Sequence, residues 1–294
     1  MPQIIGFIGL GNMGRHMAGN LMGSGFQLRA FNRTREKARE LEERGAVVVD
    51  RPEEVATPGG IAVSMLADDG ALESLAGEGL AAALGKGGLH ISMSTILPAT
   101  SERLAEQYAK HGAAVIAAPV FGRPDAAEAR KLWICASGPI PEKQRAKPVF
   151  DAIGQGVFDF GEKVGAANVV KLAGNFMLTA AIEAMAEASA LAEKNGLPRE
   201  QLLGMLTHTL FNCPIYNNYS KRLIDADFDK VGFALVLALK DMMLAHQTAA
   251  ASRAPMPILS LLCDRYVSAI AKGRGALDAS GLALGAADDA GLHW

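Results

Sequence analysis

The 294-residue chain has few cysteines, no long apolar run and no excess of positive charge. Its three cysteines, Cys135, Cys213 and Cys263, are odd in number and form no CxxC pair, which argues against a disulfide framework and favours a reducing cytoplasmic location. No stretch reaches the roughly 18 uninterrupted apolar residues of a membrane span. No basic leader precedes the first apolar run, so we expect no signal peptide.

Two further absences narrow the function. The net charge of −2 offers no basic surface for nucleic acid. The six histidines are scattered without an HxxxH or equivalent pair, so we expect no metal site. What the chain does contain is apolar residues, which make up 50% of it and can bury a sizeable core.

The first half alternates short apolar runs with helical patterns. This alternation predicts a parallel sheet covered by helices on both faces. The expected strands are residues 3–9, 26–32, 46–50, 60–66, 89–95, 113–119 and 132–137, and the expected helices are residues 13–25, 34–45, 71–84 and 98–112.

After about residue 165 the pattern is almost wholly helical. The first helix is expected to run for about 30 residues, until Asn195, Gly196 and Pro198 stop it. Later helices are expected over residues 199–210, 233–253 and 257–273. The sequence therefore predicts an α/β Rossmann domain over residues 1–162 and an all-α domain over residues 163–294, with a long helix between them.

A glycine-rich segment follows the first strand and opens a helix, which is the context that a dinucleotide-binding GxGxxG motif requires. Gly9 permits the tight turn, Gly11 lets the backbone approach a diphosphate, and Gly14 lets helix and strand pack closely. A diphosphate there would lie at a helix N-terminus, which favours anions. The expected cofactor-binding residues of this segment are Gly9, Leu10, Gly11, Asn12, Met13 and Gly14.

The end of the second strand bears on the choice between NAD(H) and NADP(H). NAD enzymes usually place a carboxylate there for the ribose hydroxyls. This chain has Asn32, Arg33 and Thr34 instead, which removes a repulsive charge and adds donors for a 2′-phosphate. We therefore expect NADP(H) to be preferred and NAD(H) to be possible. The alternative is that Arg33 belongs to the solvated face of the next helix.

Six segments together resemble the β-hydroxyacid dehydrogenases in order and spacing: "IGFIGLGNMGRHMAGNLMGSGF", "FNRT", "STILPATS", "APVFGRPDA", "KLAGNFML" and "FALVLALKDMMLA". This family includes 3-hydroxyisobutyrate dehydrogenase and glyoxylate/succinic semialdehyde reductases. The resemblance covers nearly the whole chain. It implies a Rossmann domain, a helical domain that builds a homodimer or homotetramer, and an active site between the domains.

The resemblance also implies roles for individual residues. Lys171 matches the family's catalytic lysine, and Asn175 matches the asparagine that helps to hold the substrate. The matched cofactor-lining residues are Leu66, Ala67, Thr95 and Lys240, and the matched substrate-carboxylate region is Ser94, Phe121, Gly122 and Arg123. Lys240 has a simpler alternative, an ordinary surface pair with Asp241.

The chain departs from the family at one of these positions. Where the family usually reads Ser-Gly-Gly, this sequence reads Phe121-Gly122-Arg123. Phe121 has no hydroxyl for a carboxylate, whereas Arg123 offers a bidentate donor or points to solvent. A standard short-chain hydroxyacid is therefore not assured as the substrate.

Lys171 and Asn175 are spaced i, i+4 and so project from one helix face. Carbonyl reduction needs a proton where negative charge grows on oxygen, and a lysine suits that task. The alternative is a lysine whose stem covers apolar surface while its amine reaches water.

The sequence predicts an NADPH-dependent oxidoreductase acting on a small carbonyl or hydroxyacid substrate. An imine reductase and a non-catalytic NADP-binding module remain alternatives, although imine reductases typically lack the lysine. The related 6-phosphogluconate dehydrogenases are less consistent with the sequence, because this chain is much shorter and has no added basic cluster for a sugar phosphate.

Overall fold

The computed structural model describes residues 3–294, so the first two residues of the expected N-terminal domain lie outside the described part of the chain. The chain divides into two compact units, the first ending at Lys171 and the second running from Leu172 to Trp294. The division falls inside a helix, beyond the boundary expected after residue 162. The start of that helix therefore belongs to the first unit.

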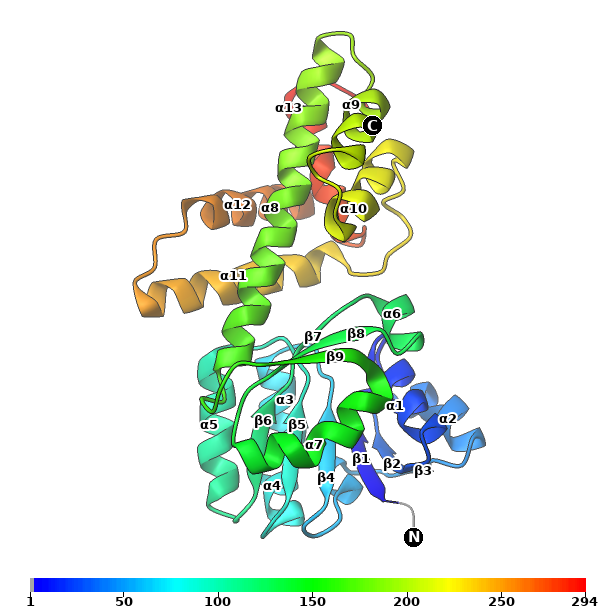
Figure 1. Cartoon of the computed structure of the whole chain (residues 1–294), viewed down its shortest axis with the longest axis vertical. Helices are drawn as coiled ribbons and strands as arrows, with labels where there is room; N and C mark the ends of the chain where they lie inside the picture. Colours follow the sequence, from blue (N-terminus) through cyan, green and yellow to red (C-terminus); the bar gives the residue numbers. More distant parts are fainter. Residues whose placement is uncertain (1–2) are drawn as a thin grey trace. The chain divides into compact units, whose positions relative to one another are not determined.

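The first unit is built on a six-stranded parallel sheet with the order β3-β2-β1-β4-β5-β6 (Figure 1). This is the strand order of the doubly wound dinucleotide-binding fold. Because both faces are covered, the central strands β1, β4 and β5 are buried almost throughout instead of alternating between buried and exposed residues. The strands are β1 (Ile4–Ile8), β2 (Gln27–Phe31), β3 (Val47–Val48), β4 (Ile61–Ser64), β5 (Leu89–Ser92) and β6 (Ala114–Ala117). The expected Rossmann architecture is confirmed.

Helices cover both faces of this sheet, and each face has its own buried core. One core contains Met17 and Leu21 of α1, and the other contains Leu80 of α4 and Leu104 of α5. The helix expected over residues 71–84 is two helices, separated at Gly77, whose φ of −89° and ψ of −130° are not helical. A Cβ atom there would lie 2.2 Å from the Glu73 carbonyl oxygen, so this break requires glycine. The elements are α1 (Gly14–Gly23), η1 (Arg35–Ala38), α2 (Arg39–Glu43), η2 (Pro52–Val55), α3 (Asp69–Ala76), α4 (Glu78–Leu84) and α5 (Pro98–Ala109).

A second, three-stranded sheet was not expected. The run predicted as a seventh strand, residues 132–137, forms the middle of this sheet and does not extend the parallel one. It pairs antiparallel with β7 and parallel with β9. The elements of this region are β7 (Val120–Phe121), α6 (Pro124–Glu128), β8 (Leu132–Ala136), α7 (Ile140–Ile153) and β9 (Gly154–Asp159).

The second unit is helical, as expected. Its first helix, α8 (Ala166–Lys194), is 29 residues long and begins in the first unit. Gly196 follows it with φ of +79°, a left-handed conformation that suits glycine and ends the helix. The others are α9 (Arg199–His208), α10 (Pro214–Asp225), α11 (Leu235–Ser252), α12 (Pro257–Ala271), η3 (Ala279–Ala283) and α13 (Leu284–Asp289).

The long helix α8 has the length and composition of a membrane span. Its most apolar 18-residue window has a mean hydropathy of 1.3, and 44% of that window is buried inside the structure. Core helices of soluble proteins meet the same criterion, so this helix is only a weak indication of a span.

Candidate functional site

The loops that follow parallel strands gather at one edge of the six-stranded sheet. Strands β2 and β3 are added on one side of β1, and β4 to β6 are added on the other. In parallel sheets of this kind, ligands bind outside the carboxyl ends of the strands at the point where the strand order switches sides. The loops after β1, β2, β4 and β5 carry most of the predicted cofactor residues. The topology therefore brings segments that are distant in sequence to one edge.

The glycines of the first loop have distinct structural roles. Gly9 has φ of +99°, and a Cβ atom there would lie 2.3 Å from the Met65 carbonyl oxygen. A Cβ atom on Gly14 would lie 1.9 Å from the Gly9 carbonyl oxygen, so the start of α1 requires glycine. At Gly11 a Cβ atom would meet nothing within 4 Å. Gly9 and Gly14 thus serve the fold, whereas Gly11 leaves space beside the backbone that a ligand can fill.

Asn32 joins the glycine-rich loop to the end of β2. The Leu10 amide donates to Asn32 Oδ1 at 2.8 Å, and Asn32 Nδ2 donates to the Thr34 carbonyl oxygen at 2.8 Å. The sequence indicated only that Asn32 lacks a negative charge. The structure adds that its amide uses both a donor and an acceptor to hold two loops together, which an aspartate cannot do.

The polar groups beyond Asn32 differ in their freedom to bind a ligand. Arg33 and Thr34 are exposed. Arg35 is engaged within the protein, because its guanidinium lies 2.6 Å from Asp50 Oδ1 and 3.3 Å from Glu42 Oε1. Arg33 is therefore the better placed of these two arginines for a phosphate. In the preceding loop, Asn12 is exposed and Met13 is half-buried.

Ser94 ties together the loops after β4 and β5. Its hydroxyl accepts a hydrogen bond from the Leu66 amide at 2.8 Å, and its side chain is fully buried. Leu66 and Thr95 are half-buried, and Ala67 is exposed. Ser94 thus positions the loops around the expected cofactor site, while a direct contact between Ser94 and a substrate stays a prediction.

Lys171 and Phe121 lie against each other in the first unit. The Lys171 Nζ atom is 4.1 Å from the centroid of the Phe121 ring, within the range of a cation–π interaction. Apolar residues pack around Phe121, among them the buried Cys135 and Ala167. Burial raises the pKa of the Cys135 thiol, and the positive charge of Lys171 opposes that rise. The lysine predicted to be catalytic is thus held in an apolar, aromatic setting.

The residues after Phe121 turn the chain into α6. Gly122 has φ of +142°, and a Cβ atom there would lie 2.6 Å from Leu132 Cδ2. Arg123, which precedes α6, is half-buried in an extended conformation. Glycine at position 122 therefore meets a backbone requirement, and its expected contact with substrate remains a prediction.

In the second unit, Asp241 links the two other polar residues that were predicted for the site. Asn175 Nδ2 donates to Asp241 Oδ2 at 2.6 Å. Lys240 Nζ lies 2.9 Å from Asp241 Oδ1, an ion pair that lacks the alignment of a hydrogen bond. The Asp241 side chain is only 3% exposed, so the alternative of an ordinary surface pair is wrong for this carboxylate. The sequence did not show that this carboxylate is buried and holds Asn175, although the adjacent "KD" letters placed it beside Lys240.

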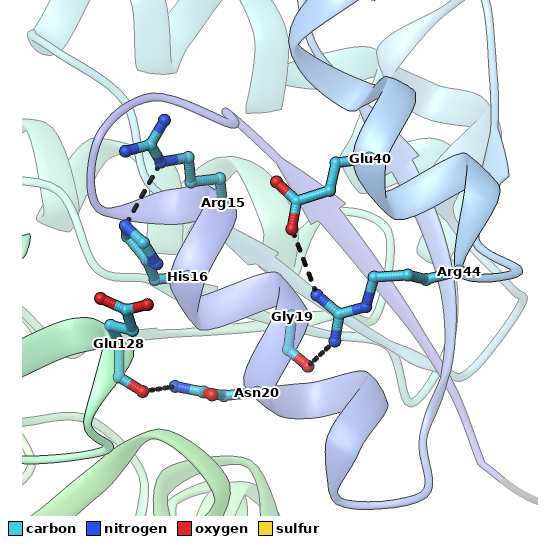
Figure 2. A pocket seen from close by; sticks show the side chains of 7 residues that line it. All are labelled: Arg15, His16, Gly19, Asn20, Glu40, Arg44 and Glu128. Carbon is cyan, nitrogen blue, oxygen red and sulfur yellow. Dashed lines mark hydrogen bonds and ion pairs between the residues drawn. The ribbon is translucent and has the colours of Figure 1, made fainter.

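A separate polar cavity lies over α1 and has a volume of about 360 Å³ (Figure 2). Arg44 Nη2 donates to the Gly19 carbonyl oxygen at 3.1 Å, and Arg44 Nη1 lies 3.7 Å from Glu40. The seven lining residues, all in the described chain, include none of the predicted site residues.

Over residues 3–294 no group of three or more His, Cys, Asp or Glu side chains is arranged to hold a metal ion.

Comparison with known proteins places the chain among dehydrogenases. Residues 4–164 match the family model of the NAD binding domain of 6-phosphogluconate dehydrogenase. Residues 165–284 match the model described as NAD-binding of NADP-dependent 3-hydroxyisobutyrate dehydrogenase. Together the two models cover residues 4–284.

Individual relatives agree with these models. An uncharacterized oxidoreductase of Bacillus subtilis, YfjR, is 41% identical over 276 residues, which cover 93% of this chain and 96% of that protein. Glyoxylate/succinic semialdehyde reductase 1 of Arabidopsis thaliana is 31% identical over 278 residues, covering 94% and 96%. The structure of Mycobacterium tuberculosis 3-hydroxyisobutyrate dehydrogenase with L-serine has a TM-score of 0.88 at 30% identity and covers 97% of this chain and 99% of that one.

Proposed function

The chain belongs to the β-hydroxyacid dehydrogenase family, and from this membership we propose that it is an NADPH-dependent oxidoreductase. It transfers a hydride between the nicotinamide and a small aldehyde, keto acid or the corresponding hydroxyacid. Lys171 acts as the general acid in reduction and the general base in oxidation. The observation that carries this proposal is the position of the Lys171 amine, which is held at the Phe121 ring in the same unit as the glycine-rich loop.

The residues at the sheet edge fit a dinucleotide. Gly11 leaves the backbone open to a diphosphate, and Gly9 and Gly14 build the turn that brings this backbone to the start of α1. Leu66, Ala67 and Thr95 follow neighbouring strands and line the cofactor in this proposal, together with Lys240. Exposed Arg33 and Thr34 would hold a 2′-phosphate, so NADP(H) is preferred and NAD(H) is possible.

Each polar residue then has a chemical task. The bound cofactor supplies or accepts the hydride. Lys171 Nζ donates a proton to the carbonyl oxygen in reduction, and a well-placed general acid contributes roughly 10²–10⁴-fold to the rate. Asn175, whose amide is anchored on Asp241, orients the substrate one helical turn away. Ser94, Phe121, Gly122 and Arg123 form the region around the substrate.

Replacement of Lys171 by alanine tests the proposal. We expect turnover to fall by about 10²–10⁴-fold while NADPH binding is kept, because the lysine acts in proton transfer. Lys163→Ala is the matched control, since Lys163 is an exposed lysine just before α8, 3.1 Å from Glu102. The assay follows NADPH absorbance against aldehydes, keto acids and cyclic imines.

The same panel separates the alternatives. Turnover of cyclic imines alone would indicate an imine reductase. Tight NADPH binding without turnover of any compound would indicate a binding module. Near-normal carbonyl reduction by Lys171→Ala would refute the role of the lysine.

Cofactor preference is tested by Asn32→Asp combined with Arg33→Ser. We expect the ratio of NADPH to NADH affinity to fall by about 10- to 100-fold, since a hydrogen bond to a charged group contributes about 1.5–3 kcal/mol. Arg35→Ser is the control, because Arg35 is already paired with Asp50 and Glu42. An unchanged affinity for NADPH in the double variant would overturn the assignment.

We propose further that the protein is a cytoplasmic homodimer or homotetramer without a nucleic-acid or membrane partner. Large apolar side chains are exposed on helices of the second unit, which is typical of a surface that a second copy covers. They are Met177, Leu191, Val236, Leu237, Met243, Ile258, Leu261 and Val267. Light scattering after size exclusion tests this, and a monomer at micromolar concentration would contradict it.

A further inference from the structure

One face of the small sheet carries a row of aromatic side chains. Phe121 of β7 lies directly opposite Trp133 of β8 in the antiparallel register, and paired residues point to the same face. Their neighbours Val120 and Ile134 point the other way and are buried in the core of the first unit. The backbone therefore assigns Phe121 and Trp133 to the face that is turned away from this core.

The row continues onto β9. Phe158 pairs with Cys135, two residues beyond Trp133, so it shares the same face. The centroids of the Trp133 and Phe158 rings are 5.8 Å apart, and the two residues are 44% and 54% exposed. Gly156 makes room for the indole, because a Cβ atom at this position would lie 2.5 Å from Trp133 Cζ3. An accessible apolar surface thus begins at Phe121 and extends across three strands.

Lys171 stands at one end of this row. The Phe121 ring attracts the ammonium form of the lysine through its π-face and offers no hydrogen-bond donor. A carboxylate pressed against the ring would lose water without gaining a partner from it, which is unfavourable, whereas an alkyl or aryl group would gain by leaving water. The wall beside the amine therefore discriminates between these two kinds of substituent.

We propose that Phe121 is both a positioning residue for Lys171 and the specificity-determining residue of the site. The preferred substrate is an aldehyde or ketone that carries an alkyl or aryl group, and not a carboxylate, next to the Phe121 ring. This inference rests on the proposed function. In the reduction, the carbonyl carbon accepts the hydride of NADPH, the oxygen accepts the Lys171 proton, and the alcohol and NADP⁺ are released.

Substrate selectivity is measured with a matched pair, butanal and succinic semialdehyde, in which a methyl group replaces a carboxylate. We expect wild-type kcat/KM to favour butanal about tenfold or more, and Phe121→Ser to shift the ratio toward the carboxylate by at least about tenfold, the range for a small change in an apolar pocket. Phe121→Leu keeps an apolar wall without adding a hydrogen-bond donor, so it should keep the preference for butanal. An equal ratio in wild type and Phe121→Ser would overturn the inference.

The positioning role is measured without turnover. Lysine amines are labelled with ¹³C-methyl groups, and the Lys171 signal, assigned by its absence in Lys171→Ala, is titrated by NMR. Phe121→Leu keeps apolar volume but removes the π-face, so we expect Lys171 to titrate about half a pH unit lower than in wild type. Phe121→Tyr should titrate as wild type. Identical titration in wild type and Phe121→Leu would overturn the positioning role.

The two experiments also separate this inference from the function on which it rests. Failure of wild type to reduce any carbonyl compound would reject the proposed function, and the titration would then decide the contact of Phe121 with Lys171 by itself. If wild type reduces carbonyl compounds but the kcat/KM ratio of butanal to succinic semialdehyde is the same in Phe121→Ser, the proposed function stands and the specificity role of Phe121 is rejected.

Discussion

Removal of the Asp241 carboxylate should weaken both the second unit and the reaction. Asp241→Ala removes the carboxylate that accepts a hydrogen bond from the Asn175 amide and forms an ion pair with Lys240. The Asn175 amide and the Lys240 amine then lose the interactions that offset their removal from water. A hydrogen bond to a buried charged acceptor contributes about 1.5–3 kcal/mol. The ion pair adds about 1 kcal/mol at most, because the Lys240 side chain is 24% exposed and can regain water.

The expected loss in the free energy of unfolding is therefore about 1.5–4 kcal/mol. Asp241→Asn should lose less, since its amide oxygen still accepts from Asn175. We expect kcat/KM to fall at least about tenfold in Asp241→Ala, which corresponds to about 1.4 kcal/mol of lost orientation at Asn175. The stability loss exceeds the activity loss because the carboxylate holds two partners and only one of them faces the substrate in the proposed site.

The assay uses the placement of the two tryptophans, one in each unit. In a Trp133→Phe background, Trp294 fluorescence during urea unfolding reports the second unit alone. Lys230→Ala is the matched control, because Lys230 and Asp227 form an exposed pair at 3.1 Å that should contribute little. The reasoning is refuted if Asp241→Ala and Lys230→Ala lower the unfolding free energy equally.

Two further predictions concern the first unit. Burial lowers the pKa of His90 to about 3 from 6.5, so the unfolded chain binds the extra proton first and stability is lost as pH falls from 6.5 toward 3. The His90 contribution to this loss between pH 7 and pH 4.5 is about 2–3 kcal/mol. In a Trp294→Phe background, where Trp133 reports the first unit, His90→Gln should remove this contribution from the urea unfolding curves. Gly14→Ala should lower both the melting temperature and NADPH affinity because its Cβ atom meets the Gly9 carbonyl oxygen, whereas Gly11→Ala should lower affinity alone. Equal melting temperatures for the two glycine variants would contradict the assigned roles.

The sequence predicted those helices and strands that depend mainly on neighbouring residues in the chain. The parallel strands follow from short apolar runs, and α8 was expected at nearly its observed length because Asn195 and Gly196 mark its end. The small sheet escaped prediction because its register depends on contacts distant in sequence. β7 has only two residues, and β9 begins with glycines that weaken a strand pattern. Helix α7 was also not among the expected helices, because Pro148 interrupts the helical pattern and packing of residues such as Phe150 against the core stabilises the helix.

The candidate site likewise has features that the sequence could show and contacts that only the fold creates. The glycine-rich loop and the Lys171–Asn175 pair were visible as motifs, since their spacing is set by one turn or one helix. The sequence also showed that Phe121 lacks a hydroxyl, but not that its ring would meet the Lys171 amine, because strand pairing and the start of α8 place the two together. The burial of Asp241 was not predicted, because it depends on the packing of α11 against other elements of the second unit, such as α12 and η3.

The position of the unit division within α8 has a consequence for protein engineering. Helix α8 runs through the division without interruption, and the division falls between Lys171 and Asn175. Four residues of helix set a rise of about 6 Å between these two positions. Chimeras that exchange units with a relative at this division would combine the lysine of one parent with the asparagine of the other. Such hybrids would keep the i, i+4 spacing of Lys171 and Asn175. The residues proposed to set the cofactor preference would come from one parent, and the Asp241 that holds Asn175 would come from the other.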